Sequence, residues 1–136
     1  MLFTQNSEVD IHEMSPLALA FVGDAVLELL VRARLVGTTR LQPNRLHTVA
    51  THYVSAHAQN LELAVIEPML TDAEAAVLRR GKNASKATVA KHATVQEYRA
   101  STGFECLLGW LYLTGQMPRV EELFEKLWAD FDPNQK

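Results

Sequence analysis

The chain has one cysteine, Cys106, among its 136 residues. A single thiol excludes an internal disulfide and suits a reducing compartment. No Lys or Arg precedes Arg32, so the basic start of a secretory signal peptide is missing. The longest uninterrupted apolar stretch, near residues 106–113, is far too short to span a bilayer. We therefore expect a cytoplasmic protein without a membrane segment.

Alternating strand patterns, internal repeats and linkers are also missing, and apolar residues recur with a helical period throughout. The apolar fraction of 48% is enough for a real core. At 136 residues the chain is expected to be one domain, spanning 1–136 with a core of about 15–131. The predicted fold class is all-α, a single compact bundle.

Turn and capping residues divide the chain into six expected helices. Ser15-Pro16 begins the first, Asn44 caps the second, and capping boxes at Thr71 and Thr94 begin the fourth and fifth. Glycines 37, 81 and 115 are expected to end helices. The expected helices cover about 16–36, 44–57, 58–67, 72–81, 94–114 and 118–131. Residues 82–93 lack apolar periodicity and are expected to form a loop.

Charge is unevenly distributed, although the net charge is only −3. Residues 1–28 hold five acids and no Lys or Arg, and residues 29–104 hold ten Lys or Arg and five acids. Residues 105–136 hold six acids and three bases. A basic segment between acidic ends hints at a polyanionic partner. Charge alone is equally compatible with ordinary solvated helix faces.

The first helix is apolar nearly all round, which is typical of a central, buried helix. A narrow polar stripe interrupts it, formed by Asp24, Glu28 and Arg32 at four-residue spacing. Because buried carboxylates need partners, Glu28 is best read as an i,i+4 ion pair with Arg32. Asp24 follows Gly23, a residue that lets another backbone approach closely.

A partner for Asp24 is expected on the fifth helix. Glu105 is the only acid between Tyr98 and Val120, and Gly109 lies one turn further on. If the two helices cross at Gly23 and Gly109, the carboxylates of Asp24 and Glu105 face each other and require a shared proton or cation. Oxygen ligands with room for water suit Mg²⁺. Spacing alone leaves this metal site one alternative among several.

Two segments of the chain resemble the ribonuclease III family. AFVGDAVL, residues 20–27, resembles its signature helix, and ECLLG, residues 105–109, resembles its second acidic motif. The match is to the Mini-III branch, whose members consist of the catalytic domain alone, and it covers roughly residues 15–128. Further segments in the style of that branch are 17–20, 43–44, 54–56, 80–84, 95–99 and 101–105.

The resemblance implies an all-α endonuclease domain that works as a homodimer on double-stranded RNA. Asp24 and Glu105 are implied as catalytic residues and Mg²⁺ ligands, and cleavage leaves a 5′-phosphate and a 3′-hydroxyl. The implied substrate is the stem of precursor 23S ribosomal RNA. Phe21 corresponds to an aromatic residue that inserts into the other subunit; the alternative is an ordinary core phenylalanine. No double-stranded-RNA-binding domain is expected.

Two departures from the larger relatives bear on the metal count. They carry Glu where this chain has Ala20 and Asp where it has Thr102. The Mini-III branch shares such losses, so activity is still expected. Two carboxylates suffice for one Mg²⁺, and a second ion would depend on RNA phosphate, water or Glu28.

The basic segment supplies the expected RNA contacts. Between Arg79 and Arg99 there are six Lys or Arg and one acid, which suits phosphate and 2′-hydroxyl contacts along A-form RNA. Arg99 has an alternative role as an internal counter-ion. The residues predicted to bind RNA are Arg79, Arg80, Lys82, Asn83, Lys86 and Lys91.

The sequence does not support a zinc site or a reactive cysteine, and two rival functions remain. Histidines 47, 52 and 57 are five apart, so they fan around a helix and cannot form an i,i+4 zinc pair. Cys106 is read as a small buried thiol. One rival function is a non-catalytic RNA-binding homologue; another, a nucleotide pyrophosphohydrolase, would need the acids 121, 122 and 125, which are better read as a solvated face.

Overall fold

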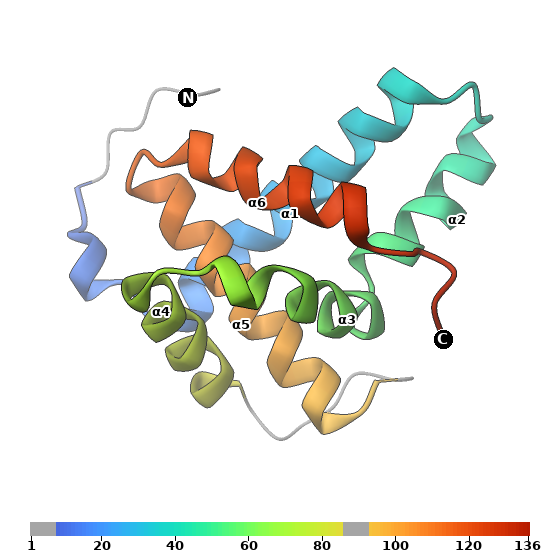
Figure 1. Cartoon of the computed structure of the whole chain (residues 1–136). Helices are drawn as coiled ribbons and strands as arrows, with labels where there is room; N and C mark the ends of the chain where they lie inside the picture. Colours follow the sequence, from blue (N-terminus) through green and yellow to red (C-terminus); the bar gives the residue numbers. More distant parts are fainter. Residues whose placement is uncertain (1–7, 86–92) are drawn as a thin grey trace.

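A computed structural model describes residues 8–85 and 93–136 and contains only helices in these ranges (Figure 1). The all-α prediction is therefore confirmed. The long helices are α1 (Pro16–Thr38), α2 (Pro43–Val54), α3 (Ala56–Ile66), α4 (Asp72–Ala84), α5 (Val95–Leu113) and α6 (Met117–Asp130). Short 3-10 turns, η1 (Ile11–Glu13) and η2 (Glu67–Met69), precede α1 and follow α3.

The two longest helices, α1 and α5, pack against each other and form the centre of the bundle. Val31 on α1 and Leu107 and Leu111 on α5 are wholly buried. Helices α3 and α4 cover α5 on other sides, α2 packs on α1, and α6 runs across the face nearest the viewer in Figure 1. The buried side chains of the central pair are therefore packed by several neighbouring helices.

The predicted capping groups are present at four helix ends. Ser15 Oγ accepts a hydrogen bond from the Ala18 N–H at 3.1 Å. Thr71 and Thr94 form complete capping boxes with the glutamates three residues on. Gly115 follows the end of α5 with φ of 76°, a conformation that glycine adopts without the steric cost of a side chain.

Two glycines expected to end helices do not, and at Gly81 the reason is close packing between two helices. Helix α1 passes through Gly37 to Thr38, and α4 passes through Gly81 to Ala84. A Cβ at Gly81 would lie 2.6 Å from the Cys106 Cβ and 2.8 Å from the Gly103 Cα. Gly81 therefore lets α4 approach α5 closely, and residues 82–84 belong to the helix rather than to a loop.

The boundary between the second and third helices was misplaced by the sequence pattern. Helix α2 ends at Val54, and Ser55 caps α3 by accepting from the Ala58 N–H at 3.1 Å. At the start of α2, Gln42 occupies the cap position without a side-chain bond and Pro43 is the first helical residue. Asn44 therefore lies within the first turn, because the fixed φ of proline suits that first position.

One side of α1 is not buried as expected. Phe21 is 83% exposed and Val36 is 65% exposed, and Leu17 and Leu29 on the same helix are also exposed. The helix is therefore central but carries an uncovered apolar face in the single chain. No helix in the described ranges is both long and apolar enough to cross a membrane.

Candidate functional site

The site begins at the crossing of α1 and α5, where two glycines bring the backbones into contact. A Cβ at Gly23 would lie 1.6 Å from the Glu105 carbonyl oxygen and 2.8 Å from the Gly109 nitrogen. A Cβ at Gly109 would lie 1.9 Å from the Leu19 carbonyl oxygen. Real Cβ atoms do not occupy such positions, so both glycines are required by the geometry. The predicted crossing is confirmed.

This crossing places Asp24 and Glu105 together. Burial raises the pKa of Glu105 to about 8, and the neighbouring Asp24 carboxyl and the charge of Glu28 add to that rise. A hydrogen bond from Gln59 acts in the opposite direction. Acidic groups on two helices therefore converge, and ionising all of them requires a compensating positive charge.

The two acids differ in burial, contrary to the expectation that both are buried. Glu105 is half-buried, whereas Asp24 is exposed. Asp24 lies at the edge of a hollow of about 430 Å³ on the uncovered face of α1. Phe21, Leu29, Tyr112 and Met117 also line this hollow. Asp24, but not Glu105, thus contributes to the hollow on the apolar face of α1.

Glu28 has its own counter-ion. The Arg32 Nε donates to the Glu28 Oε2 at 3.0 Å, which confirms the i,i+4 pairing predicted from the sequence. The Arg32 side chain is 63% exposed, so its charge is largely in solvent. Neither Asp24 nor Glu105 pairs with a Lys or Arg within residues 8–85 and 93–136.

Helix α3 contributes two polar residues that the sequence reasoning missed. Gln59 is 1% exposed, and its Nε2 donates to the Glu105 Oε2 at 3.2 Å and to the Val54 carbonyl at 3.0 Å. Glu62, one turn further on, is wholly buried. A signal was present in the sequence: both lie in register with the buried apolar positions 58, 63 and 66 of α3, where polar residues are unusual.

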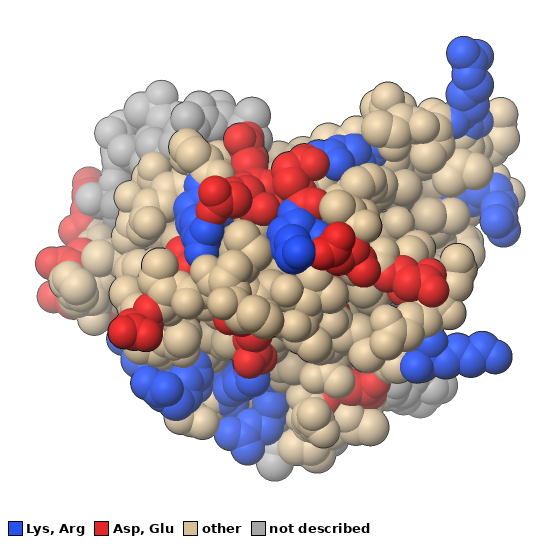
Figure 2. Space-filling model, in the orientation of Figure 1, with Lys and Arg blue, Asp and Glu red and all other residues tan. Residues whose placement is uncertain are grey.

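Only some of the residues predicted to bind RNA lie together in the structure. Arg79, Lys82 and Asn83 line a hollow of about 380 Å³ between the end of α4 and the start of α5. Arg80 is exposed on α4 but does not line it, and Lys86 and Lys91 lie outside the described residues. Figure 2 shows Lys and Arg side chains over this end of α4, and acidic side chains over α6.

Arg99 is not a counter-ion to the acid pair. Its Nε donates to the Lys82 carbonyl at 3.1 Å and its Nη2 donates to the Asn83 Oδ1 at 3.2 Å. It therefore satisfies a carbonyl at the end of α4 and fixes Asn83 at the rim of the basic hollow. Thr102, which stands where larger relatives carry an acid, donates to the Tyr98 carbonyl of its own helix at 3.0 Å.

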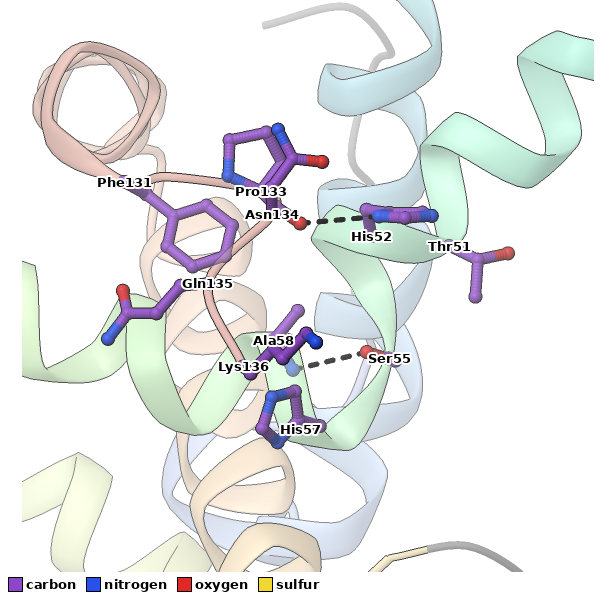
Figure 3. Close-up of a pocket in the computed structure, with 10 residues that line it drawn as sticks. All are labelled: Thr51, His52, Ser55, His57, Ala58, Phe131, Pro133, Asn134, Gln135 and Lys136. Carbon is purple, nitrogen blue, oxygen red and sulfur yellow. Dashed lines mark hydrogen bonds between the residues drawn. The ribbon is translucent and has the colours of Figure 1, made fainter.

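His52, His57 and Cys106 have structural partners. His57 Nδ1 donates to the Glu97 Oε2 at 2.5 Å. His52 Nδ1 donates to the Pro133 carbonyl at 3.2 Å, across a hollow between the α2–α3 corner and the C-terminal tail (Figure 3). Cys106 is 1% exposed, and burial raises the pKa of its thiol to about 11. The reading of Cys106 as a buried thiol is confirmed.

The acid pair fits a divalent cation by the chemistry of its donors. It offers carboxylate oxygens from two helices, one exposed and one half-buried, with no Lys or Arg paired to them in the described residues. Hard oxygen ligands with open positions suit Mg²⁺. No group of three or more His, Cys, Asp or Glu side chains in the described part of the chain is arranged to hold a metal. Asp24 and Glu105 could together hold one cation that keeps several waters.

Comparisons with known proteins agree with this geometry. A model of the ribonuclease III domain matches residues 17–116. Mini-ribonuclease 3 of Enterococcus faecalis is 47% identical over 116 residues, covering 84% of this chain and 88% of the relative. Mini-ribonuclease 3 of Symbiobacterium thermophilum is 46% identical over 118 residues, covering 87% and 90%.

A solved structure supports the fold independently. The crystal structure of a protein from Fusobacterium nucleatum superposes with a TM-score of 0.80 at 28% identity, covering 88% of this chain and 96% of that one. The crossed helices and their acidic motifs thus define an endoribonuclease domain, and the chain belongs to the ribonuclease III family. Within that family it falls in the Mini-ribonuclease 3 branch.

Proposed function

We propose that this chain is a Mg²⁺-dependent endoribonuclease that cleaves double-stranded RNA, and that its substrate is the stem of precursor 23S ribosomal RNA in the cytoplasm. The observation that carries this proposal is the convergence of Asp24 and Glu105 at the α1–α5 crossing. Neither acid is paired with a basic side chain among the described residues, which leaves their charge for a cation beside a phosphodiester.

In this proposal, each part of the site has a defined task. Asp24 and Glu105 hold the cation, and Gln59 orients the Glu105 carboxylate through its hydrogen bond of 3.2 Å. A divalent cation bound there acidifies water and offsets negative charge at the phosphate. Glu28 stays paired with Arg32. No serine, cysteine or histidine nucleophile is needed, and the products carry a 5′-phosphate and a 3′-hydroxyl.

RNA is held by the basic end of α4 in this proposal. Arg79 and Lys82 are positive groups beside the amide of Asn83, which Arg99 fixes in place. Arg80, Lys86 and Lys91 extend the same basic stretch in the sequence. Phosphate contacts of this kind recognise the shape of a duplex rather than its bases.

A homodimer completes the proposed enzyme. Phe21 is 83% exposed beside the hollow of about 430 Å³, an exposure that excludes the alternative of a core phenylalanine. In the proposed two-fold dimer, Phe21 of each protomer enters the hollow of the other. The symmetry of such an interface makes this contact occur twice. Asp24 lies at the edge of the same hollow, so this interface would place the two acidic sites close to the dimer axis, with one site for each RNA strand.

The rival functions are less well supported. A non-catalytic RNA-binding homologue would have no need for two unpaired acids at the crossing. A pyrophosphohydrolase would need the α6 acids as metal ligands, but Glu122 pairs with Arg119 and Glu125 pairs with Arg34. These acids are engaged at the surface of the bundle.

The test is cleavage of a long RNA duplex with Mg²⁺ and with EDTA, followed by mapping of the ends. We expect Asp24→Asn and Glu105→Gln each to reduce cutting by at least about a thousandfold while duplex RNA still binds, because each removes transition-state charge stabilisation. Asp130→Asn, an acid on α6 paired with Lys126, is the matched control and should cut normally. Full activity in both site variants would refute the assignment, and binding without any cutting by the parent chain would favour the rival.

A further inference from the structure

Three buried oxygen atoms on α3 have no hydrogen-bond partner within the described part of the chain. They are the Gln59 Oε1 and both carboxyl oxygens of Glu62. A buried acceptor left without a donor costs about 1–3 kcal/mol, so such groups are rare in native proteins. The two residues lie three apart on one helix and share its buried face, where i and i+3 side chains are neighbours.

The orientation of the Gln59 amide is fixed by its other contacts. The Val54 carbonyl can only accept, so the Gln59 nitrogen must face it, and the same nitrogen donates to Glu105. The Gln59 oxygen therefore points away from both, and it needs a donor. An ionised Glu62 has none, because a carboxylate only accepts. A single proton on Glu62 supplies the missing donor.

The surroundings of Glu62 favour that proton. Glu62 is wholly buried, and burial alone raises its pKa to about 9. No Lys, Arg or His pairs with it in residues 8–85 and 93–136. Tyr53 on α2 lies close enough for the charge of Glu62 to add to the rise that burial causes in the Tyr53 pKa. The neutral acid is thus the form that this site accommodates at pH 7.

We propose that Glu62 is a positioning residue: its carboxyl O–H donates to the Gln59 carbonyl and keeps the Gln59 N–H turned towards Glu105. The proposal deepens the proposed function, on which it rests, because Glu105 is there a cation ligand. Mutating a residue that orients a metal ligand through a hydrogen bond typically lowers metal affinity or activity by about 10- to 100-fold. Glu62 acts on the acid pair only through Gln59.

The test measures Mn²⁺ affinity without RNA, and kcat and KM for a duplex, in a small set of variants. Glu62→Met keeps the length of the side chain but offers no donor, and we expect about tenfold weaker Mn²⁺ binding and a similar fall in kcat with KM unchanged. Glu62→Gln, whose amide N–H can donate, should restore both values to within about twofold of the parent. Equal behaviour of the Met and Gln variants would overturn the proposal.

A double-variant cycle isolates the route through Gln59. Gln59→Leu alone should weaken Mn²⁺ binding by about 10- to 100-fold. Adding Glu62→Met to Gln59→Leu should then cost nothing more, because the residue through which Glu62 acts is gone. Additive losses would show that Glu62 acts by another route. Circular dichroism and urea unfolding establish that each variant is folded at the assay temperature.

One measurement needs no variant and separates this proposal from the proposed function. In the parent chain the Gln59 side-chain N–H signals should exchange with solvent at least about tenfold more slowly than those of exposed Gln135, because both bonds of the Gln59 nitrogen are buried. Exchange as fast as that of Gln135 would overturn the proposal even if the enzyme cuts RNA. Unchanged Mn²⁺ affinity in Asp24→Asn and Glu105→Gln would instead refute the metal site itself.

Discussion

The α1–α5 crossing and the basic end of α4 meet the same substrate in the proposed enzyme, but they are built in opposite ways. At the crossing, backbone touches backbone, and a Cβ at Gly23 would lie 1.6 Å from the Glu105 carbonyl oxygen. At the end of α4, Arg79 and Asn83 are exposed side chains around an open hollow. The proposed cation site is therefore fixed by main-chain contact, whereas the proposed RNA contacts come from separate side chains that can be replaced one at a time.

Replacing Gly23 should disrupt the packing of α1 against α5 and give the largest effect. We expect Gly23→Ala to lower the free energy of unfolding by more than about 4 kcal/mol, because the clash is with backbone atoms that cannot turn aside. The matched control is Gly37→Ala on the same helix, where a Cβ meets nothing within 4 Å. That change should stabilise the protein by about 0.4–1 kcal/mol. Urea unfolding measures both, and equal effects would contradict the close crossing.

Replacing Phe21 tests the surface next to the crossing. Phe21→Asp should give monomers in sedimentation and lose most duplex cleavage, because a charge cannot be buried in an apolar interface without a partner. The folded state should persist, since Phe21 is 83% exposed in the single chain. Val95→Asp makes the same change at an exposed apolar residue of α5 and should leave the sedimentation coefficient unaltered. A dimer that survives in Phe21→Asp would remove this face from the interface.

Replacing basic side chains should have the smallest effect. Arg79→Ala with Lys82→Ala should weaken duplex binding and flatten its dependence on salt by about one slope unit for each lost phosphate contact. Arg40→Ala with Lys126→Ala removes the same net charge elsewhere and should leave the slope unchanged. Equal slopes for the two double variants would mean that α4 has no particular place in the RNA path.

The same contrast explains what the sequence predicted well. Capping boxes, the Gly23–Gly109 crossing and the pairing of Glu28 with Arg32 depend on residues a few positions apart or on the absence of a side chain, and such signals are local. The helix limit at Gly81 was wrong because the sequence alone does not distinguish a glycine that ends a helix from one that lets a neighbouring helix approach. The two cases are distinguished only by the residues that pack against the glycine, which for Gly81 are Gly103 and Cys106. The limit near Gly37 was about two residues short, since α1 ends at Thr38.

The environment of the acids was harder to predict. Periodicity indicated that α1 is apolar on both sides, but it does not show which side the other helices cover, so the exposure of Asp24 was missed. The exposure of Phe21 is compatible with the dimer contact that the family resemblance implied. Gln59 and Glu62 were not predicted because they lie on α3, outside the two central helices that carry the acidic motifs. Their role depends on which buried polar atoms meet across α3 and α5, and that is a property of the packed structure.

The position of Cys106 has a practical consequence for experiments on this protein. Its thiol is held between α4 and α5, it is 1% exposed, and burial raises its pKa to about 11. Since the thiolate is the form that reacts with maleimides and iodoacetamides, the native chain should resist labelling at neutral pH. A cysteine introduced on the exposed surface of α6 would then be labelled selectively. A fluorophore attached there could be used to follow RNA binding without first replacing Cys106.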